Sequence, residues 1–209
     1  MQAAIDLRVC VAGDSFVHGV GDPSGGGWVG RLAAESRRRG HALTAYDLGV
    51  RMETSADVAA RWYGEAVPRM RHADGCGMVF AFGVNDVTLD GGRRRVRHED
   101  SVANLDAILD TATGARWTCL VVGAPPVPAE PDDVEAALAL EEAYAKTCAA
   151  RGVPFVPTHR ALREDPAWWR SVEACGDGAH CDGDGYAMIA ALVAAGGWWD
   201  WLESLAPRP

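Results

Sequence analysis

The sequence predicts an α/β fold, a three-layer α/β/α sandwich in which a five-stranded parallel sheet lies between two layers of helices. Two observations predict it. Short apolar runs alternate along the chain with longer amphipathic segments, and each apolar run has the length of a strand buried on both faces. The 209 residues suit a single domain spanning 1–209, because no linker, internal repeat or low-complexity tract divides them.

The predicted strands are short and mostly apolar, as expected where helices cover both faces of a parallel sheet. They span residues 8–13, 43–48, 78–82, 118–122 and 153–156. Sheets of this kind bind ligands at the carboxyl ends of their strands. The residues that follow these segments are therefore the first candidates for a functional site.

Between the strands, apolar residues recur at helical spacing. The stripe of Val58, Trp62, Ala66 and Met70, four residues apart, is typical of one buried helix face. Comparable patterns, with Gly152 marking the end of one of them, predict helices over 28–39, 54–71, 101–112 and 131–150 and a last one after Asp184.

Composition excludes several classes of protein. Residues 101–209 carry 7 basic and 16 acidic side chains and hold the whole net charge of −9, which argues against a nucleic-acid partner. No apolar run reaches the roughly eighteen residues of a membrane span. The N-terminal residues lack the basic-then-apolar profile of a secretory signal, so we expect a cytoplasmic protein, unless a leader has been removed.

The six cysteines show neither a CxxC pair nor the spacing of a zinc site, so no metal is expected from them. Cys175 and Cys181 bracket the segment 176–180. A disulfide between them is an open alternative, although a reducing cytosol disfavours it.

Ser15 lies on the turn at the carboxyl end of the first predicted strand, in Ala12-Gly13-Asp14-Ser15. A serine hydroxyl becomes a nucleophile only beside a base and near donors for the oxyanion. Taken alone, the Asp14-Ser15 pair is more typical of a helix cap.

Two further strand ends could supply oxyanion donors. Gly49 follows the second strand and could offer an unobstructed backbone N–H, and Asn85 follows the third in Gly83-Val84-Asn85-Asp86. The alternative for the second segment is a turn closed by Asn and Asp.

A base is available near the C-terminus, in Asp177-Gly178-Ala179-His180 just before the last predicted helix. An Asp three residues before a His, on a glycine-containing loop, can accept a bond from the imidazole and leave the other ring nitrogen free. By itself, Asp-x-x-His is usually a surface turn.

Together the four blocks, Gly13-Asp14-Ser15, Gly49, Gly83 to Asp86 and Asp177 to His180, resemble the SGNH hydrolases, also called the GDSL-type lipase and esterase family. The resemblance spans roughly residues 8–195 and depends on all four blocks in this order.

The resemblance implies a flavodoxin-like sheet and a serine hydrolase without metal or cofactor. By it, Ser15 is the nucleophile, His180 the general base and then acid, and Asp177 the residue that orients His180. The oxyanion hole is expected to consist of the backbone N–H groups of Ser15 and Gly49 and the side chain of Asn85.

The chain departs from the family pattern in two places. Cys181 stands where Pro often follows the final His, and Val17 stands where a polar residue is frequent. His18 and Asp86 are candidate substrate contacts, with a structural role as the alternative for His18.

The expected function is hydrolysis of small or polar carboxylic esters through an acyl-serine intermediate. The segments 88–100 and 124–133 should border the site, and they offer few large apolar residues for a long acyl chain. Carbohydrate deacetylation and acyl transfer on the same triad remain alternatives, and the oligomeric state stays open.

Two hypotheses from other classes compete. One is a flavodoxin-like binding module without catalysis, which the presence of all triad and oxyanion residues disfavours. The other is a metal-dependent phosphoesterase using Asp14, Asn85, Asp86 and His180, which lacks the His-rich motifs of a two-metal site.

Overall fold

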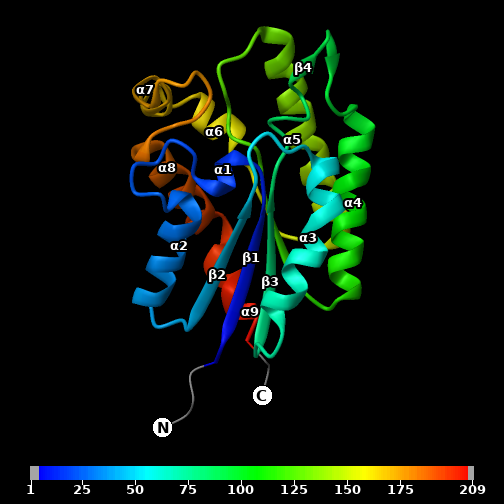
Figure 1. Ribbon diagram of the computed structural model, residues 1–209, viewed down its shortest axis with the longest axis vertical. Coiled ribbons are helices and arrows are strands. Elements are labelled where there is room, and N and C mark those ends of the chain that lie inside the picture. Colours follow the sequence, from blue (N-terminus) through cyan, green and yellow to red (C-terminus); the bar gives the residue numbers. More distant parts are fainter. Residues whose placement is uncertain (1–4, 207–209) are drawn as a thin grey trace.

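The computed structural model describes residues 5–206, and a parallel sheet forms its centre (Figure 1). Five strands run in the order β2-β1-β3-β6-β7 and every neighbouring pair is parallel. This order is the flavodoxin-like one and confirms the predicted sheet. Their bounds are Leu7–Gly13 for β1, Leu43–Gly49 for β2, Gly75–Ala81 for β3, Thr118–Val122 for β6 and Phe155–Val156 for β7.

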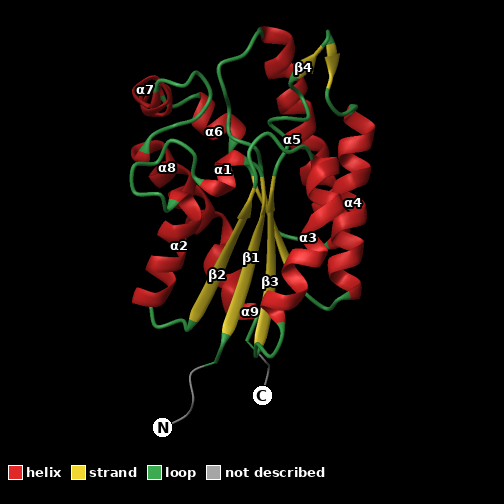
Figure 2. Cartoon of the chain, viewed as in Figure 1, coloured by secondary structure: helices red, strands yellow, loops and turns green. Residues whose placement is uncertain are grey.

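Helices cover both faces of the sheet (Figure 2). On one face lie α3 (Ser55–Met70), α4 (His98–Gly114) and α5 (Pro131–Arg151), and on the other lie α2 (Gly27–Arg38), α8 (Gly183–Val193) and α9 (Trp199–Ser204). All but α9 match helices expected from apolar periodicity. The remaining elements are α1 (Ser15–His18), the hairpin β4 (Leu89–Asp90) and β5 (Arg93–Arg94), α6 (His159–Arg163), α7 (Pro166–Cys175) and the π-helical turn η1 (Ala194–Trp198).

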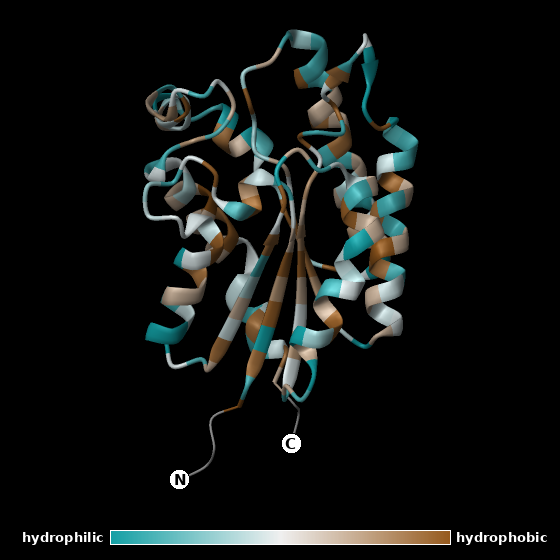
Figure 3. Cartoon of the chain, viewed as in Figure 1, coloured by the Kyte–Doolittle hydropathy of each residue, from teal (hydrophilic) through white to brown (hydrophobic). Residues whose placement is uncertain are grey.

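Each strand contributes to two hydrophobic clusters, one per face. In β1, Val9 and Val11 pack with the cluster that includes Trp28 of α2, whereas Cys10 and Ala12 pack with the cluster that includes Trp62 of α3. Alternate side chains of a strand point to opposite faces, so a strand between two helical layers must be apolar throughout. The hydrophobic colouring of the central strands in Figure 3 reflects this burial.

The sheet brings three strand ends to one level. In the pairing register Gly13 stands opposite Gly49 of β2 on one side and Ala81 of β3 on the other. A Cβ on Gly13 would lie 1.9 Å from the Ala81 carbonyl oxygen, and one on Gly49 would lie 2.4 Å from the backbone nitrogen of His18. Both positions need glycine because backbone atoms approach so closely at this edge.

The main differences from the predicted elements have physical causes. Strand β3 begins at Gly75 rather than at residue 78, and a Cβ on Gly75 or Gly77 would collide with Leu205 or Trp201, since α9 packs against the sheet there. Glycine does not favour strands, so the sequence did not predict this extension of β3. Strand β7 contains only Phe155 and Val156, because only these residues pair with β6.

Within residues 5–206, none of the helices combines the length and the hydrophobicity that a membrane crossing requires. The expectation that the N-terminal residues form no secretory signal includes residues 1–4, and these lie outside the described residues.

Candidate active site

Three predicted residues form a continuous hydrogen-bonded chain at the carboxyl edge of the sheet. His180 Nε2 lies 2.7 Å from Ser15 Oγ, and His180 Nδ1 lies 2.6 Å from Oδ2 of Asp177. Ser15 and His180 are both buried, at 7% and 8% exposure. A carboxylate that accepts the Nδ1 proton leaves Nε2 as the free base toward the hydroxyl.

The loop between α7 and α8 fixes the acid and the base. Gly176 ends α7 in the left-handed region at φ 76°, and the second oxygen of Asp177 accepts the N–H groups of Ala179 at 2.9 Å and His180 at 2.8 Å. Burial raises the pKa of Asp177, but these backbone donors and the imidazole outweigh it and bring the pKa to about 2. Asp177 is therefore ionised at neutral pH.

The nucleophile turn is held by Asp14. Its carboxylate caps α1 by accepting the N–H of Phe16 at 2.9 Å, which fixes the backbone on both sides of Ser15. Burial raises the pKa of Asp14 to about 7. The ring of Phe16 lies 5.0 Å from that of His180 and packs the base against the turn.

Asn85 lies on the loop after β3, the neighbour of β1 in the sheet, and its side chain is fixed. Its Nδ2 donates to the Glu53 carbonyl at 2.8 Å, and the residue is only 8% exposed. A carboxamide has two N–H donors, so one remains for a developing oxyanion. The loop 82–86 after β3 and the loop 50–54 after β2 are thereby held together.

Gly49 is engaged differently from what we expected. Its backbone N–H donates to Oδ1 of Asp47 at 2.7 Å, so in this conformation it is not free to receive an oxyanion. The other oxygen of Asp47 faces Nδ1 of His18 at 3.2 Å, and the His18 side chain is 60% exposed. His18 therefore reaches solvent beside the nucleophile turn, where a substrate contact remains a proposal.

A backbone feature that the sequence reasoning missed lies at Met52. This residue adopts left-handed backbone at φ 66° and directly precedes Glu53, whose carbonyl binds Asn85. Among the described residues its N–H has no hydrogen-bond acceptor. Left-handed backbone is rare for non-glycine residues and often marks functional sites, but the sequence gives no sign of it.

The expected substrate contact of Asp86 is wrong. Asp86 is fully buried, and its Oδ1 accepts the N–H of Ser55 at 2.7 Å at the start of α3. Burial raises the pKa of this carboxyl, while bonds from Ser101 and Ser55 oppose the rise. Asp86 anchors the segment that carries Asn85 to α3.

The residues of the phosphoesterase hypothesis do not share one site. Asp86 turns toward Ser55, Asp14 toward Phe16 and His180 toward Ser15. Within residues 5–206, no group of three or more His, Cys, Asp or Glu side chains has the arrangement of a metal site. Cys175 and Cys181 carry free thiols, so the disulfide alternative is not realised here.

Comparison with protein families gives one match, to the model of the GDSL-like lipase/acylhydrolase family over residues 11–188. This match includes Ser15, Asn85, Asp177 and His180. The chain belongs to the GDSL-like lipase/acylhydrolase family. The comparison with curated proteins gave no match.

Solved structures share the fold over nearly the whole chain at low sequence identity. A lipase/acylhydrolase from Enterococcus faecalis is 18% identical with a TM-score of 0.75, covering 97% of this chain and 98% of its own. A catalytic mutant of Axe2, an acetylxylan esterase from Geobacillus stearothermophilus, is 14% identical with a TM-score of 0.75 and full coverage of both chains. The psychrotrophic esterase EstA from Pseudoalteromonas sp. is 15% identical with a TM-score of 0.70, covering 94% and 98%.

Membership of the GDSL-like lipase/acylhydrolase family establishes the protein as a hydrolase of the esterase type. The structural similarities, at these identities, establish the fold. The roles of individual residues rest on the geometry of this chain.

Proposed function

We propose that this protein hydrolyses small or polar carboxylic esters, with Ser15 as nucleophile, His180 as general base and Asp177 as the residue that orients His180. The single observation that carries the proposal is the unbroken chain from Asp177 through His180 to Ser15, with contacts of 2.6 and 2.7 Å. Both distances lie within the range of short hydrogen bonds.

The reaction proceeds in two halves. Ser15 Oγ attacks the ester carbonyl while His180 Nε2 takes its proton, and the tetrahedral intermediate collapses when His180 returns that proton to the leaving alcohol. Water then attacks the acyl-serine with His180 again as base, and the carboxylic acid leaves. Asp177, ionised throughout, stabilises the imidazolium formed in each half.

The oxyanion of each tetrahedral intermediate needs fixed donors. We assign the backbone N–H of Ser15 and the amide of Asn85 to this role, since Ser15 follows β1 and Asn85 lies on the loop after the neighbouring strand β3. As the third donor we assign the N–H of Met52, which has no acceptor among the described residues, whereas Asp47 accepts the N–H of Gly49. The Gly49 N–H could donate to the oxyanion only if it gave up its hydrogen bond to Asp47.

The natural partner in this proposal is a small-molecule ester, and the cellular location is the cytoplasm. Six free thiols support a reducing compartment. The second half of the sequence, with 7 basic against 16 acidic side chains, disfavours nucleic acid as a partner.

The test is labelling with a fluorophosphonate followed by mass spectrometry of the intact and digested protein. We expect one adduct on Ser15 in the wild type, none in Ser15→Ala and slow labelling in His180→Ala. Ser204→Ala, a change at an exposed serine of α9, is the matched control and should label normally. An unlabelled, folded wild type would overturn the proposal, and a labelled one should then be screened with short esters and acetylated sugars.

A further inference from the structure

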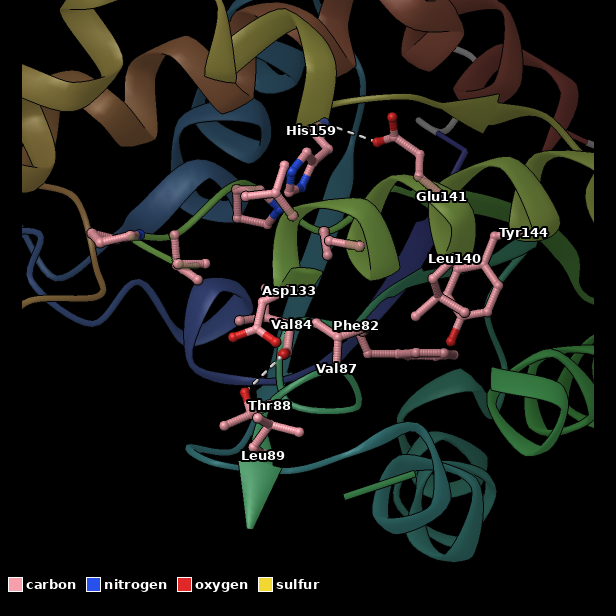
Figure 4. Close-up of a pocket in the computed structure, with 18 residues that line it drawn as sticks. Phe82, Val84, Val87, Thr88, Leu89, Asp133, Leu140, Glu141, Tyr144 and His159 are labelled. Carbon is pink, nitrogen blue, oxygen red and sulfur yellow. Dashed lines mark hydrogen bonds between the residues drawn. The ribbon is translucent and has the colours of Figure 1, made fainter. Parts of the chain in front are cut away.

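A pocket of about 140 Å³ opens beside Asn85 but contains none of the triad residues. It lies between the loop after β3, the loop after β6 and the first half of α5 (Figure 4). Val84, the neighbour of Asn85, lines it, and a small cavity lined by Asp14 and Phe16 shares Phe82 with it. The two neighbours of Ser15 in the chain, Asp14 and Phe16, therefore line a cavity that borders this pocket.

Most of the pocket wall is aliphatic. A cavity of about 150 Å³ accommodates a ring of six carbons, so the volume here suits a group of about that size. Apolar walls of this kind favour an apolar occupant. The aliphatic lining includes Val84, Val87, Val127, Val134, Ala137 and Leu140.

Two buried polar atoms of residues that line the pocket, His159 Nε2 and the Tyr144 hydroxyl oxygen, lack a hydrogen-bond partner among the described residues. His159 is 5% exposed, and its Nε2 has no hydrogen-bond partner among the described residues. Burial lowers the pKa of His159 and the Glu141 carboxylate opposes the change, so the ring is neutral at pH 7. A neutral imidazole with its proton on Nδ1 leaves Nε2 as an acceptor.

The other polar side chains of the pocket are acceptors too. Glu141 already accepts the N–H groups of Thr158 at 2.9 Å and His159 at 2.8 Å, and Asp133 is paired with Arg94. The Thr88 hydroxyl already donates its proton to the Val84 carbonyl at 3.1 Å. Figure 4 shows His159 and Glu141 across the pocket from Thr88 and Leu89.

Tyr144 lines the pocket with its ring, and its buried hydroxyl has no hydrogen-bond partner among the described residues. Apart from this hydroxyl, the polar side chains of the wall offer acceptors to an occupant. An anionic group would face carboxylates, and an ammonium would lose its hydration in an apolar cavity, whereas a hydroxyl costs less to desolvate.

We propose that this pocket holds the part of the ester outside the reacting carboxyl group, and that it selects an apolar group of about six carbons bearing a hydroxyl that donates to His159 Nε2. The inference rests on the proposed function and names the substrate class of that site. His159 is here a specificity residue and takes no part in the bond-making steps.

The experiment compares kcat/KM within two matched pairs of esters. One pair is ethyl hexanoate and ethyl 6-hydroxyhexanoate, and the other is hexyl acetate and 6-hydroxyhexyl acetate. We expect the wild type to prefer the hydroxylated member of at least one pair by about three- to tenfold, the value of one hydrogen bond. His159→Phe keeps an aromatic ring without the acceptor and should abolish the preference, while His159→Gln, whose amide oxygen replaces Nε2, should retain most of it.

Fluorophosphonate labelling of Ser15, measured in the same samples, separates this inference from the proposed function. Normal labelling with no preference in either pair, or with a preference that His159→Phe leaves intact, overturns the inference and leaves the esterase proposal standing. Absence of labelling in the folded wild type overturns both. Thermal unfolding of each variant checks that a lost preference does not come from a lost fold.

Discussion

Ser15 Oγ and His180 Nε2 are 2.7 Å apart, although 165 residues separate them in the chain. The contact between His180 and Asp177, in contrast, is local and spans three residues. The base and its orienting acid are therefore fixed by one loop, and the nucleophile meets them only when the sheet and α8 have formed.

Asp177→Asn should lower kcat/KM about 10³-fold or more. The oxygen at the Oδ1 position must keep accepting two backbone N–H groups, so the new NH₂ faces Nδ1 of His180. That reverses the tautomer and places a proton between Nε2 and Ser15. Steady-state kinetics with a short ester measure the loss, and Asp184→Asn, at an exposed position in α8, should change it little. A loss below tenfold would contradict the assigned role.

Asn85→Ala should reduce kcat by about 10²–10³-fold with a smaller effect on KM, because the lost donor acts mainly on the oxyanion. The Glu53 carbonyl also loses its partner, so a modest loss of stability is expected. The control is Asn104→Ala, which removes a 2.9 Å bond to Ser55 and no proposed oxyanion donor. Equal effects of the two substitutions on kcat would argue against Asn85 as an oxyanion donor.

Asp14→Asn should raise the free energy of unfolding relative to the wild type more at pH 8 than at pH 5. The pKa of Asp14 is raised to about 7 in the folded state, above the pKa of about 4 of an aspartate in the unfolded chain. Its contribution to stability is therefore full below about pH 4 and is lost as the pH rises through about 7.

Asparagine does not titrate and keeps an oxygen for the N–H of Phe16, so the advantage of Asp14→Asn should grow by about 1 kcal/mol or more between these pH values. Thermal or denaturant unfolding at both pH values measures it. Parallel stability curves for variant and wild type would show that Asp14 does not carry this linkage.

Met52→Gly should stabilise the protein by about 1 kcal/mol, because left-handed backbone strains residues with a Cβ. The Met52 side chain is 62% exposed, so little packing is lost, and the backbone N–H assigned to the oxyanion remains. Urea unfolding gives the change in stability, and kcat/KM should stay near the wild-type value. Arg116→Gly, at φ 60° and outside the site, should stabilise similarly, and a destabilised Met52→Gly would contradict the strain.

The parallel sheet and the helices that pack on it could be predicted because burial on both faces leaves continuous apolar runs and helical stripes. The short α6 and α7 were not predicted. Trp168 of α7 is fully buried, but its Nε1 bonds to the Pro126 carbonyl at 3.0 Å, a contact between distant segments that local periodicity does not encode.

At the site, the order of the blocks predicted that Ser15, Asp177 and His180 lie at one edge of the sheet, and the structure brings these three residues into contact. The expectation for Asp86 was wrong because its burial depends on how α3 docks. The strained backbone at Met52 and the bond from Gly49 to Asp47 arise from loop geometry, for which the sequence has no signal.

The loop that carries Asp177 and His180 is anchored at both ends. Gly176 closes α7, and Asp182 begins α8 and donates its N–H to Ser171 Oγ at 3.1 Å. The acid and the base consequently move as one body, and a single separation, that between His180 and Ser15, sets whether the hydroxyl is activated. We therefore expect a displaced loop to stop turnover while the proton between Asp177 and His180 keeps its NMR signal, whereas a broken contact between the two residues would remove that signal as well.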